Sequence, residues 1–115
     1  MLAGAGGIVS TVEDLAKFAI AQFDALNGVL ALTRKPTFQV NEKGSVGLGW
    51  HINQEVSGRT WVMHSGGTGG YTSSIVLDIE SQNGIIILSN VSAFNPQMRH
   101  IDKLSFELIT SLTPE

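Results

Sequence analysis

A histidine stands directly before a run of glycines in the stretch WVMHSGGTGGYTS, residues 61–73. His64 is followed by Ser65, Gly66 and Gly67. Backbone without a Cβ lets a ligand lie alongside it, and free N–H groups there can donate to a developing oxyanion. The residues therefore fit one edge of a catalytic site. They also fit a tight β-bulge or turn in which glycine only relieves strain, and taken alone they leave both interpretations open.

Phosphate and metal chemistry match this stretch poorly. A phosphate-binding loop needs a lysine after its glycines, and no lysine lies nearby. A dinucleotide fingerprint beginning at Gly67 would need glycine at position 72, which is Thr72, and a helix where the pattern predicts a strand. The chain has no cysteine, and its histidines, His51, His64 and His100, show no paired spacing. We therefore expect no cofactor and no metal ion.

A helix is predicted over residues 10–28, ahead of the histidine stretch. Ser10 is a favourable N-cap, and Glu13 three positions later completes a capping box. Asn27 and Gly28 predict a left-handed stop. The apolar face of this helix is expected to comprise Leu15, Phe18, Ala19, Phe23 and Leu26. Residues 29–45 are weakly patterned and are predicted to form a loop.

Alternating apolar residues predict strands over 46–54, 59–64, 71–80 and 85–90. In the first of these, Val46, Leu48, Trp50 and Ile52 are expected to share one face. Asn83-Gly84 predicts the hairpin turn before the last strand, whose apolar run is typical of a strand covered on both sides.

A final helix is predicted to open at Asn95-Pro96. Its apolar face is expected to comprise Met98, Ile101, Leu104, Leu108 and Leu112. The order of elements predicts an α+β fold, in which an antiparallel sheet of three to four strands carries an N-terminal and a C-terminal helix. We expect residues 1–115 to form a single domain.

Composition excludes several classes of partner. The chain is 43% hydrophobic and 15% charged, with a net charge of −3 and no long run of either sign, so we expect no nucleic-acid partner. It contains no apolar stretch long enough for a membrane span. A charge fraction this low also favours a surface that partly faces another domain.

The segment from Trp61 to Leu112 resembles the C-terminal end of the serine β-lactamase and penicillin-binding-protein superfamily. It is most similar to the branch of class C β-lactamases, D-alanyl-D-alanine carboxypeptidases and serine esterases. The resemblance rests on WVMHSGGTGGYTSSIVLDIE, then NGIIILSN, then the helix opening NPQMRHIDKL. The upstream GAGGIVSTVEDLAKF and VGLGW resemble the segments that precede this region in the same branch.

The resemblance assigns roles to His64-Ser65-Gly66, which matches the third active-site motif of that superfamily. It implies that His64 places a polar or positive group near the substrate, that Ser65 hydrogen-bonds the substrate or its carboxylate, and that the Gly67 N–H is one arm of the oxyanion hole. Gly66 and Thr68 are expected to line the same substrate site. Histidine in place of lysine is commoner among the esterases and peptidases, which shifts the expectation away from antibiotic hydrolysis.

The two other motifs of the superfamily are missing. No serine has a lysine three residues later, so the Ser-x-x-Lys nucleophile is absent. Tyr71-Thr72-Ser73 does not match the second motif, and Ser81-Gln82-Asn83 matches it only by letters, within a predicted hairpin turn. We therefore expect a C-terminal portion of a catalytic domain, inactive alone, that completes a site with a missing N-terminal part. The resemblance implies that this parent is a bacterial hydrolase exported to the periplasm or beyond.

Two other functions stay open. The chain could be a non-catalytic module, similar to penicillin-binding proteins, that binds peptide or cell-wall ligands. It could also be a plain folding domain whose glycines only form a turn. In the parent fold that the resemblance implies, two N-terminal strands join the sheet beside residues 84–90. Without them, that strand is an exposed edge, and we expect a tendency to self-associate through it.

Overall fold

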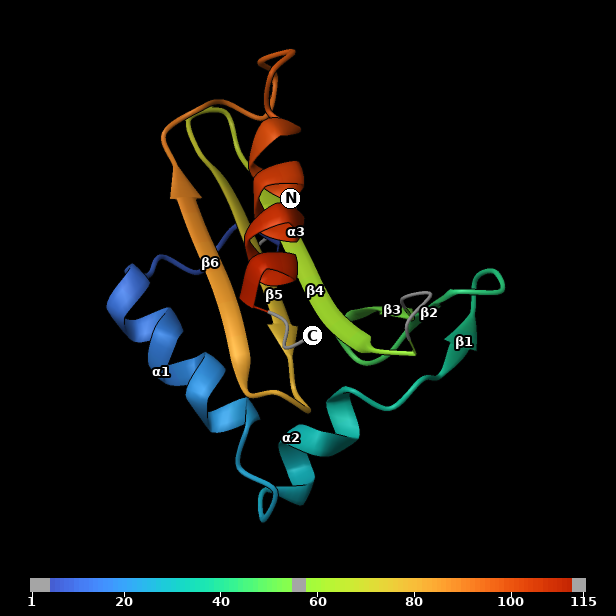
Figure 1. The fold of residues 1–115 in the computed structure, drawn as a ribbon. Helices are drawn as coiled ribbons and strands as arrows, with labels where there is room; N and C mark the ends of the chain where they lie inside the picture. The colour runs from blue at the N-terminus through green and yellow to red at the C-terminus, as the bar shows by residue number, and fades with distance from the viewer. Residues whose placement is uncertain (1–4, 55–57, 113–115) are drawn as a thin grey trace.

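The part of the chain that the computed structural model describes, residues 5–54 and 58–112, contains one antiparallel sheet in which consecutive strands are neighbours (Figure 1). The strands are β1 (Phe38–Gln39), β2 (Gly44–Val46), β3 (His51–Gln54), β4 (Thr60–Gly67), β5 (Thr72–Asp78) and β6 (Asn83–Ser89). The helices are α1 (Val12–Gln22), α2 (Gly28–Thr33) and α3 (His100–Leu112). The predicted α+β class is confirmed, with more strands than expected. Residues 1–4, 55–57 and 113–115 of the expected single domain lie outside the described residues.

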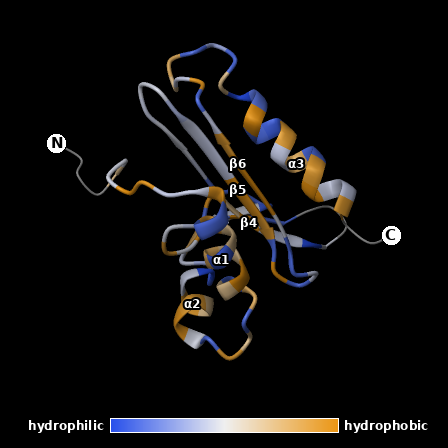
Figure 2. Cartoon of the chain, turned by 90° about the vertical axis from the view of Figure 1, so that its left-hand side faces the viewer, coloured by the Kyte–Doolittle hydropathy of each residue, from blue (hydrophilic) through white to orange (hydrophobic). Residues whose placement is uncertain are grey.

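Helices cover both faces of the sheet, α1 on one and α3 on the other (Figure 2). Neighbouring residues of a strand point to opposite faces, so β4 and β5 supply two cores. Val62 and Leu77 pack with Ala19 of α1, whereas the residues beside them in the sequence, Trp61 and Val76, pack with Ile109 of α3. Each of the described helices falls short of the length and apolarity that a bilayer crossing requires.

The N-terminal helix is shorter than predicted. Thr11, not Ser10, is its N-cap, with a hydroxyl that accepts a hydrogen bond from the Asp14 N–H at 3.2 Å. Asn27 does not stop this helix but caps the next one, because its side chain accepts from the Leu30 N–H at 3.1 Å. The predicted loop over 29–45 therefore contains most of α2, together with β1 and the start of β2.

The strand predicted over 46–54 is a hairpin of β2 and β3. The Gly47 N–H donates to the Trp50 carbonyl at 2.9 Å, and Gly49 between them has a φ of +85°, which favours glycine. Leu48 consequently leaves the predicted face and is 58% exposed. Trp50 and Ile52 do reach the core on the α1 side, as expected.

The hairpin of β5 and β6 exists, but its turn precedes Asn83-Gly84. Asn83 and Gly84 already pair with Asp78 and Leu77 in the ladder. The turn spans 79–82 and places Gln82 at a φ of +57°. Gly84 is needed for packing, because a Cβ there would lie 2.7 Å from Leu77 Cδ2. Strand β6 has β5 as its single neighbour in the described sheet, and its residues are mostly half-buried rather than covered on both sides.

The C-terminal helix begins at His100 rather than at Asn95-Pro96, and it turns a different face to the sheet from the one predicted. Ser105 and Ile109 are fully buried, whereas three predicted core residues, Leu104, Leu108 and Leu112, are 39–47% exposed. The reason is polar: the Ser105 hydroxyl donates to the Ile101 carbonyl at 2.8 Å and lies 2.9 Å from the Ser74 hydroxyl of β5. That pairing and the packing of Ile109 and Phe106 against Trp61 together turn this face of the helix toward the sheet.

Candidate functional site

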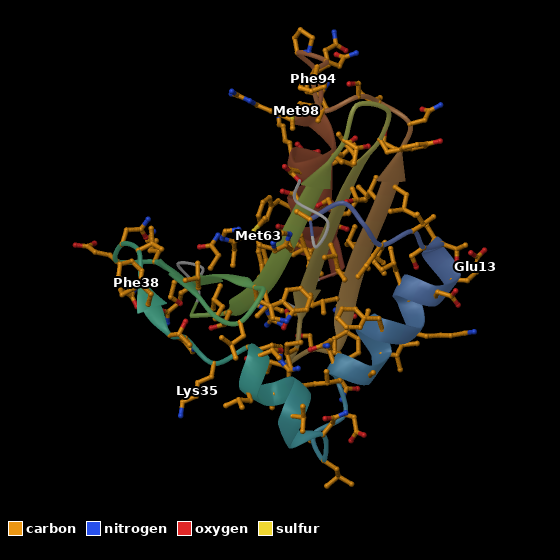
Figure 3. The ribbon with its side chains drawn as sticks, turned by 180° about the vertical axis from the view of Figure 1, so that it is seen from behind. Glu13, Lys35, Phe38, Met63, Phe94 and Met98 are labelled. Atoms are coloured by element: carbon orange, nitrogen blue, oxygen red, sulfur yellow. The ribbon has the colours of Figure 1, made fainter. Side chains whose placement is uncertain are left out.

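Strand β4 extends beyond its neighbour β3. The β3 ladder ends where His51 faces Met63, so residues 64–67 of β4 have a ladder partner only on the β5 side. Met63, labelled in Figure 3, marks the point where β3 stops. Beyond it lies an open edge, which we call the β4 edge and define as His64, Ser65, Gly66 and Gly67. All four residues are exposed.

The register decides which backbone groups face the β4 edge. The Gln54 N–H donates to the Lys43 carbonyl, toward the β2 side, so His51 and Asn53 direct their N–H and C=O groups toward β4. Their partners on β4 are Met63 and Trp61. Because backbone orientation alternates along a strand, the N–H and C=O groups of Ser65 and Gly67 point to the same side as those of Trp61 and Met63. Beyond the end of β3, that side is the open edge of the sheet. The Thr68 N–H obeys the same alternation, because it bonds across the β5 side to the Tyr71 carbonyl at 2.8 Å.

His64 projects from the face that α1 covers. Its ladder partner Ile75 packs against the core on that side, and paired residues share a face. His64 Nδ1 lies 2.7 Å from the Ser65 carbonyl oxygen. A carbonyl only accepts, so Nδ1 is the donor in this contact and Nε2 is the ring nitrogen left for other partners. The backbone thus sets the tautomer of the histidine.

The side chain of Ser65 lies on the opposite face. Its partner is Ser74, which bonds to Ser105 of α3. The structure therefore brings His64 and Ser65 together at the backbone edge but separates their side chains across the sheet. Thr68 follows the strand and closes the turn to β5, with its carbonyl accepting from the Ala93 N–H at 2.9 Å.

Gly66 and Gly67 lie in a regular ladder, opposite Ser73 and Thr72, and not in a bulge or turn. The turn comes later, at Thr68–Tyr71. A Cβ on Gly66 would lie 2.8 Å from Ser73 Oγ, and a Cβ on Gly67 would lie 2.7 Å from the Cβ of Ala93. The Cβ of Ala93 cannot rotate away, so packing requires glycine at 67, whereas Ser73 Oγ can turn aside from a Cβ at 66. The two glycines leave the β4 edge bare.

An apolar pocket of about 290 Å³ adjoins His64. Its apolar lining comes from Phe18, Leu30, Leu48, Trp50 and Ile75. Phe18 stacks on Trp50 with ring centroids 6.2 Å apart, which joins α1 to the hairpin of β2 and β3. Sequence reasoning missed these pocket residues, because they come from four segments that only the fold brings together.

Gln22 supplies polarity to the wall of this pocket. It is 1% exposed, and its Nε2 has no hydrogen-bond partner in the described part of the chain, while its Oε1 accepts from Arg34 at 2.6 Å. Burial lowers the pKa of Arg34, but the group stays cationic at neutral pH. The pocket thus combines an apolar lining with one unpaired amide donor.

A second histidine lies beside the first. The rings of His51 and His64 have centroids 5.4 Å apart and planes tilted by 35°. His51 also lines a larger hollow of about 760 Å³, formed with residues 40–45 of the hairpin of β1 and β2. Within the described residues, no three histidine, aspartate or glutamate side chains gather closely enough to hold a metal ion.

Comparison with known proteins gives a family match and matches among solved structures. The family model described as Beta-lactamase matches residues 1–108. Among solved structures, the chain is similar to the octameric penicillin-binding protein homologue from Pyrococcus abyssi, with 25% sequence identity and a TM-score of 0.64. That similarity covers 83% of this chain and 24% of the other, so the chain spans about a quarter of that protein's length. A search of the curated proteins gave no match.

Proposed function

The chain belongs to the beta-lactamase family, and from that premise we propose that it forms one wall of the active site of a serine hydrolase. The reaction would be acyl transfer through an acyl-enzyme, with an ester, a D-alanyl peptide or a β-lactam as substrate. The observation that carries the proposal is the β4 edge, where the N–H and C=O groups of Ser65 and Gly67 point outward beside His64.

In this proposal, the substrate lies along the β4 edge as a short extra strand. The Gly67 N–H donates to the carbonyl oxygen of the substrate and stabilises the oxyanion that develops there. The Ser65 carbonyl accepts from a substrate N–H where one exists, and already holds the ring of His64 in place. His64 Nε2 is then free to accept or hold a proton near the leaving group. Gly66 and Thr68 bound the same surface.

The nucleophile must come from elsewhere. No serine in this chain has a lysine three residues later, and an oxyanion donor without a nucleophile has no covalent step to assist. We propose that a longer protein supplies Ser-x-x-Lys and the second motif from an N-terminal part, and that this part is the partner of the present chain. We further propose, from the family, that this protein is exported.

The pocket beside His64 favours an apolar acyl group. Its lining includes Phe18, Trp50 and Ile75, and burial of apolar surface stabilises a bound group in proportion to the area covered. Together with histidine in place of lysine, these features favour a short-chain ester over a β-lactam.

Hydrolysis assays test the proposal. The 115-residue chain should not hydrolyse a short-chain nitrophenyl ester or a chromogenic cephalosporin. In the longer protein, His64→Ala should lower kcat/KM for the ester by about a hundredfold, as loss of acid–base groups typically does. Thr60→Ala, on the same strand and remote from the β4 edge, is the matched control. Turnover by the chain that survives His64→Ala and Ser65→Ala would show that the site is wrongly assigned.

A non-catalytic binding module is the second candidate, because the nucleophile motif is missing from this chain. The two candidates differ in covalent chemistry. Mass spectrometry of the longer protein incubated with a penicillin or an active ester should show an acyl adduct if it is a hydrolase. Ligand-induced shifts of the Ser65 and Gly67 amide resonances without any adduct would favour the binding module instead.

A further inference from the structure

The fold places two histidines side by side at the junction of β3 and β4. His51 opens β3 opposite Met63, and His64 is the next residue along β4, so alternation starts their side chains on opposite faces of the sheet. At the open end of β3 the two rings nevertheless approach each other. Their ring centroids are 5.4 Å apart, and both residues are exposed. Nothing in the proposed acyl-transfer chemistry requires His51.

The spacing suits a shared metal ion. An imidazole nitrogen binds Zn²⁺ at about 2.0–2.1 Å, and a tetrahedral angle between two such ligands sets the ring centroids roughly 5 Å apart. Histidine ligands typically donate their other ring N–H to a carbonyl or carboxylate, which fixes the tautomer. His64 already does this through Nδ1 and the Ser65 carbonyl, and so presents Nε2 as the ligand atom.

We propose that His51 and His64 form a two-histidine site for a divalent late transition-metal ion such as Zn²⁺. Imidazole suits Zn²⁺, Ni²⁺ and Cu²⁺, whereas Mg²⁺ and Ca²⁺ prefer oxygen ligands. Because no third histidine, aspartate or glutamate joins the pair in the described residues, water completes the coordination sphere and the ion exchanges readily.

Occupancy would have a consequence for catalysis. The ion takes His64 Nε2, the same nitrogen that we assign to the acyl-transfer site, so metal and substrate would compete. This consequence rests on the proposed function. Metal binding itself does not, and it is measured on the present chain without any turnover.

The three histidines of the sequence allow a matched test. The chain is titrated with ZnCl₂ by calorimetry, and the histidine Cε1–H resonances are followed by NMR. We expect one Zn²⁺ per chain, with shifts at His51 and His64 and none at His100. His51→Gln and His64→Gln should each weaken binding by at least about tenfold, because two linked ligands bind far more tightly than one. His100→Gln and titration with MgCl₂ are the controls.

Several outcomes would overturn the site. These are undiminished Zn²⁺ binding in the His51→Gln, His64→Gln double variant, loss of binding in His100→Gln, and one ion shared between two chains. All three positions are exposed, so the variants should keep the fold. Far-UV circular dichroism checks that they do. If the chain does not bind Zn²⁺ but the longer protein hydrolyses the ester, the metal site is wrong and the proposed function stands. If the chain binds Zn²⁺ through both histidines but the longer protein hydrolyses no ester, the metal site stands and the proposed function is wrong.

Discussion

Two open edges of the same sheet differ in what they can bind. The β4 edge, His64–Gly67, is short, exposed and rich in glycine, and it adjoins an apolar pocket. Strand β6, Asn83–Ser89, carries Ile85, Ile86, Ile87 and Leu88 and is mostly half-buried. Both edges present backbone groups without a ladder partner in the described sheet, but the β4 edge carries two consecutive glycines, whereas β6 carries one, Gly84, ahead of its four apolar residues. We infer that backbone exposure alone does not define a site and that the side chains beside it do.

The two edges differ because different partners can pair their backbone groups and cover their side chains. An edge of apolar residues is best completed by another strand, because strand addition pairs the backbone and covers the side chains together. An edge of glycines admits a small carbonyl compound at close range. We propose that this chain self-associates through β6.

The largest loss of stability is expected from a change in β5, the strand that pairs with both β4 and β6. Leu77 of β5 is fully buried and pairs with Val62 of β4 and Gly84 of β6. Leu77→Ala should reduce the free energy of unfolding by about 2–5 kcal/mol, because it leaves a cavity in the core between the sheet and α1. Urea denaturation measures this. Leu26→Ala, at a position 95% exposed, should stay within about 0.5 kcal/mol, and equal losses would contradict the assigned core.

The core of the sheet could be predicted because alternation identifies it. Ile75, Leu77 and Ile79 occupy alternate positions of the strand predicted over 71–80, and all three pack on the α1 side. Caps and turns were harder, because Asn27 and Asn83 suit several positions by type. Each is placed by a contact that the sequence does not reveal: Asn27 by the Leu30 N–H, and Asn83 by its pairing with Asp78.

The next largest loss of stability is expected from a substitution at the β4 edge. Gly67→Ala would place its Cβ 2.7 Å from the Cβ of Ala93 and should destabilise the fold by about 1–3 kcal/mol through overpacking. Adding Ala93→Gly should restore most of this loss. Gly70→Ala meets nothing within 4 Å and is the control. Equal stability of Gly67→Ala and the wild type would mean that this glycine is not constrained by packing.

The candidate site was only half visible in the sequence. His64, Ser65 and the glycines are consecutive in the sequence and so are recognisable as a cluster, and their proposed role comes from a family resemblance. His51, Phe18 and Trp50 carry no local signal of a site, because they lie on other segments and approach His64 only through the β3 ladder and the α1 packing. The inward face of α3 was likewise not predictable from its leucines, because it is set by the Ser105–Ser74 contact and by the packing of Ile109 and Phe106 against Trp61.

A smaller change in stability but a clear change in assembly is expected at β6. Leu88 is 41% exposed, and a lysine on an edge strand opposes strand addition. Leu88→Lys should therefore abolish concentration-dependent association, measured by sedimentation velocity, while the free energy of unfolding changes by about 0.5 kcal/mol or less. Leu104→Lys, on an exposed part of α3, controls for general solubility. Loss of association in both variants alike would remove β6 from the explanation.

The finest test compares single amides of the two edges by hydrogen exchange. By the ladder alternation, Ser65 and Gly67 direct their N–H groups outward from β4, and Ile86 and Leu88 direct theirs outward from β6. These amides should exchange faster than those of their neighbours Gly66 and Ile87, which face β5. Raising the protein concentration should protect Ile86 and Leu88 if β6 pairs with another copy, while Ser65 and Gly67 stay fast until a ligand occupies the β4 edge. Uniform protection along β4 in the free chain would mean that its edge is closed, and a substrate strand would then have nowhere to lie.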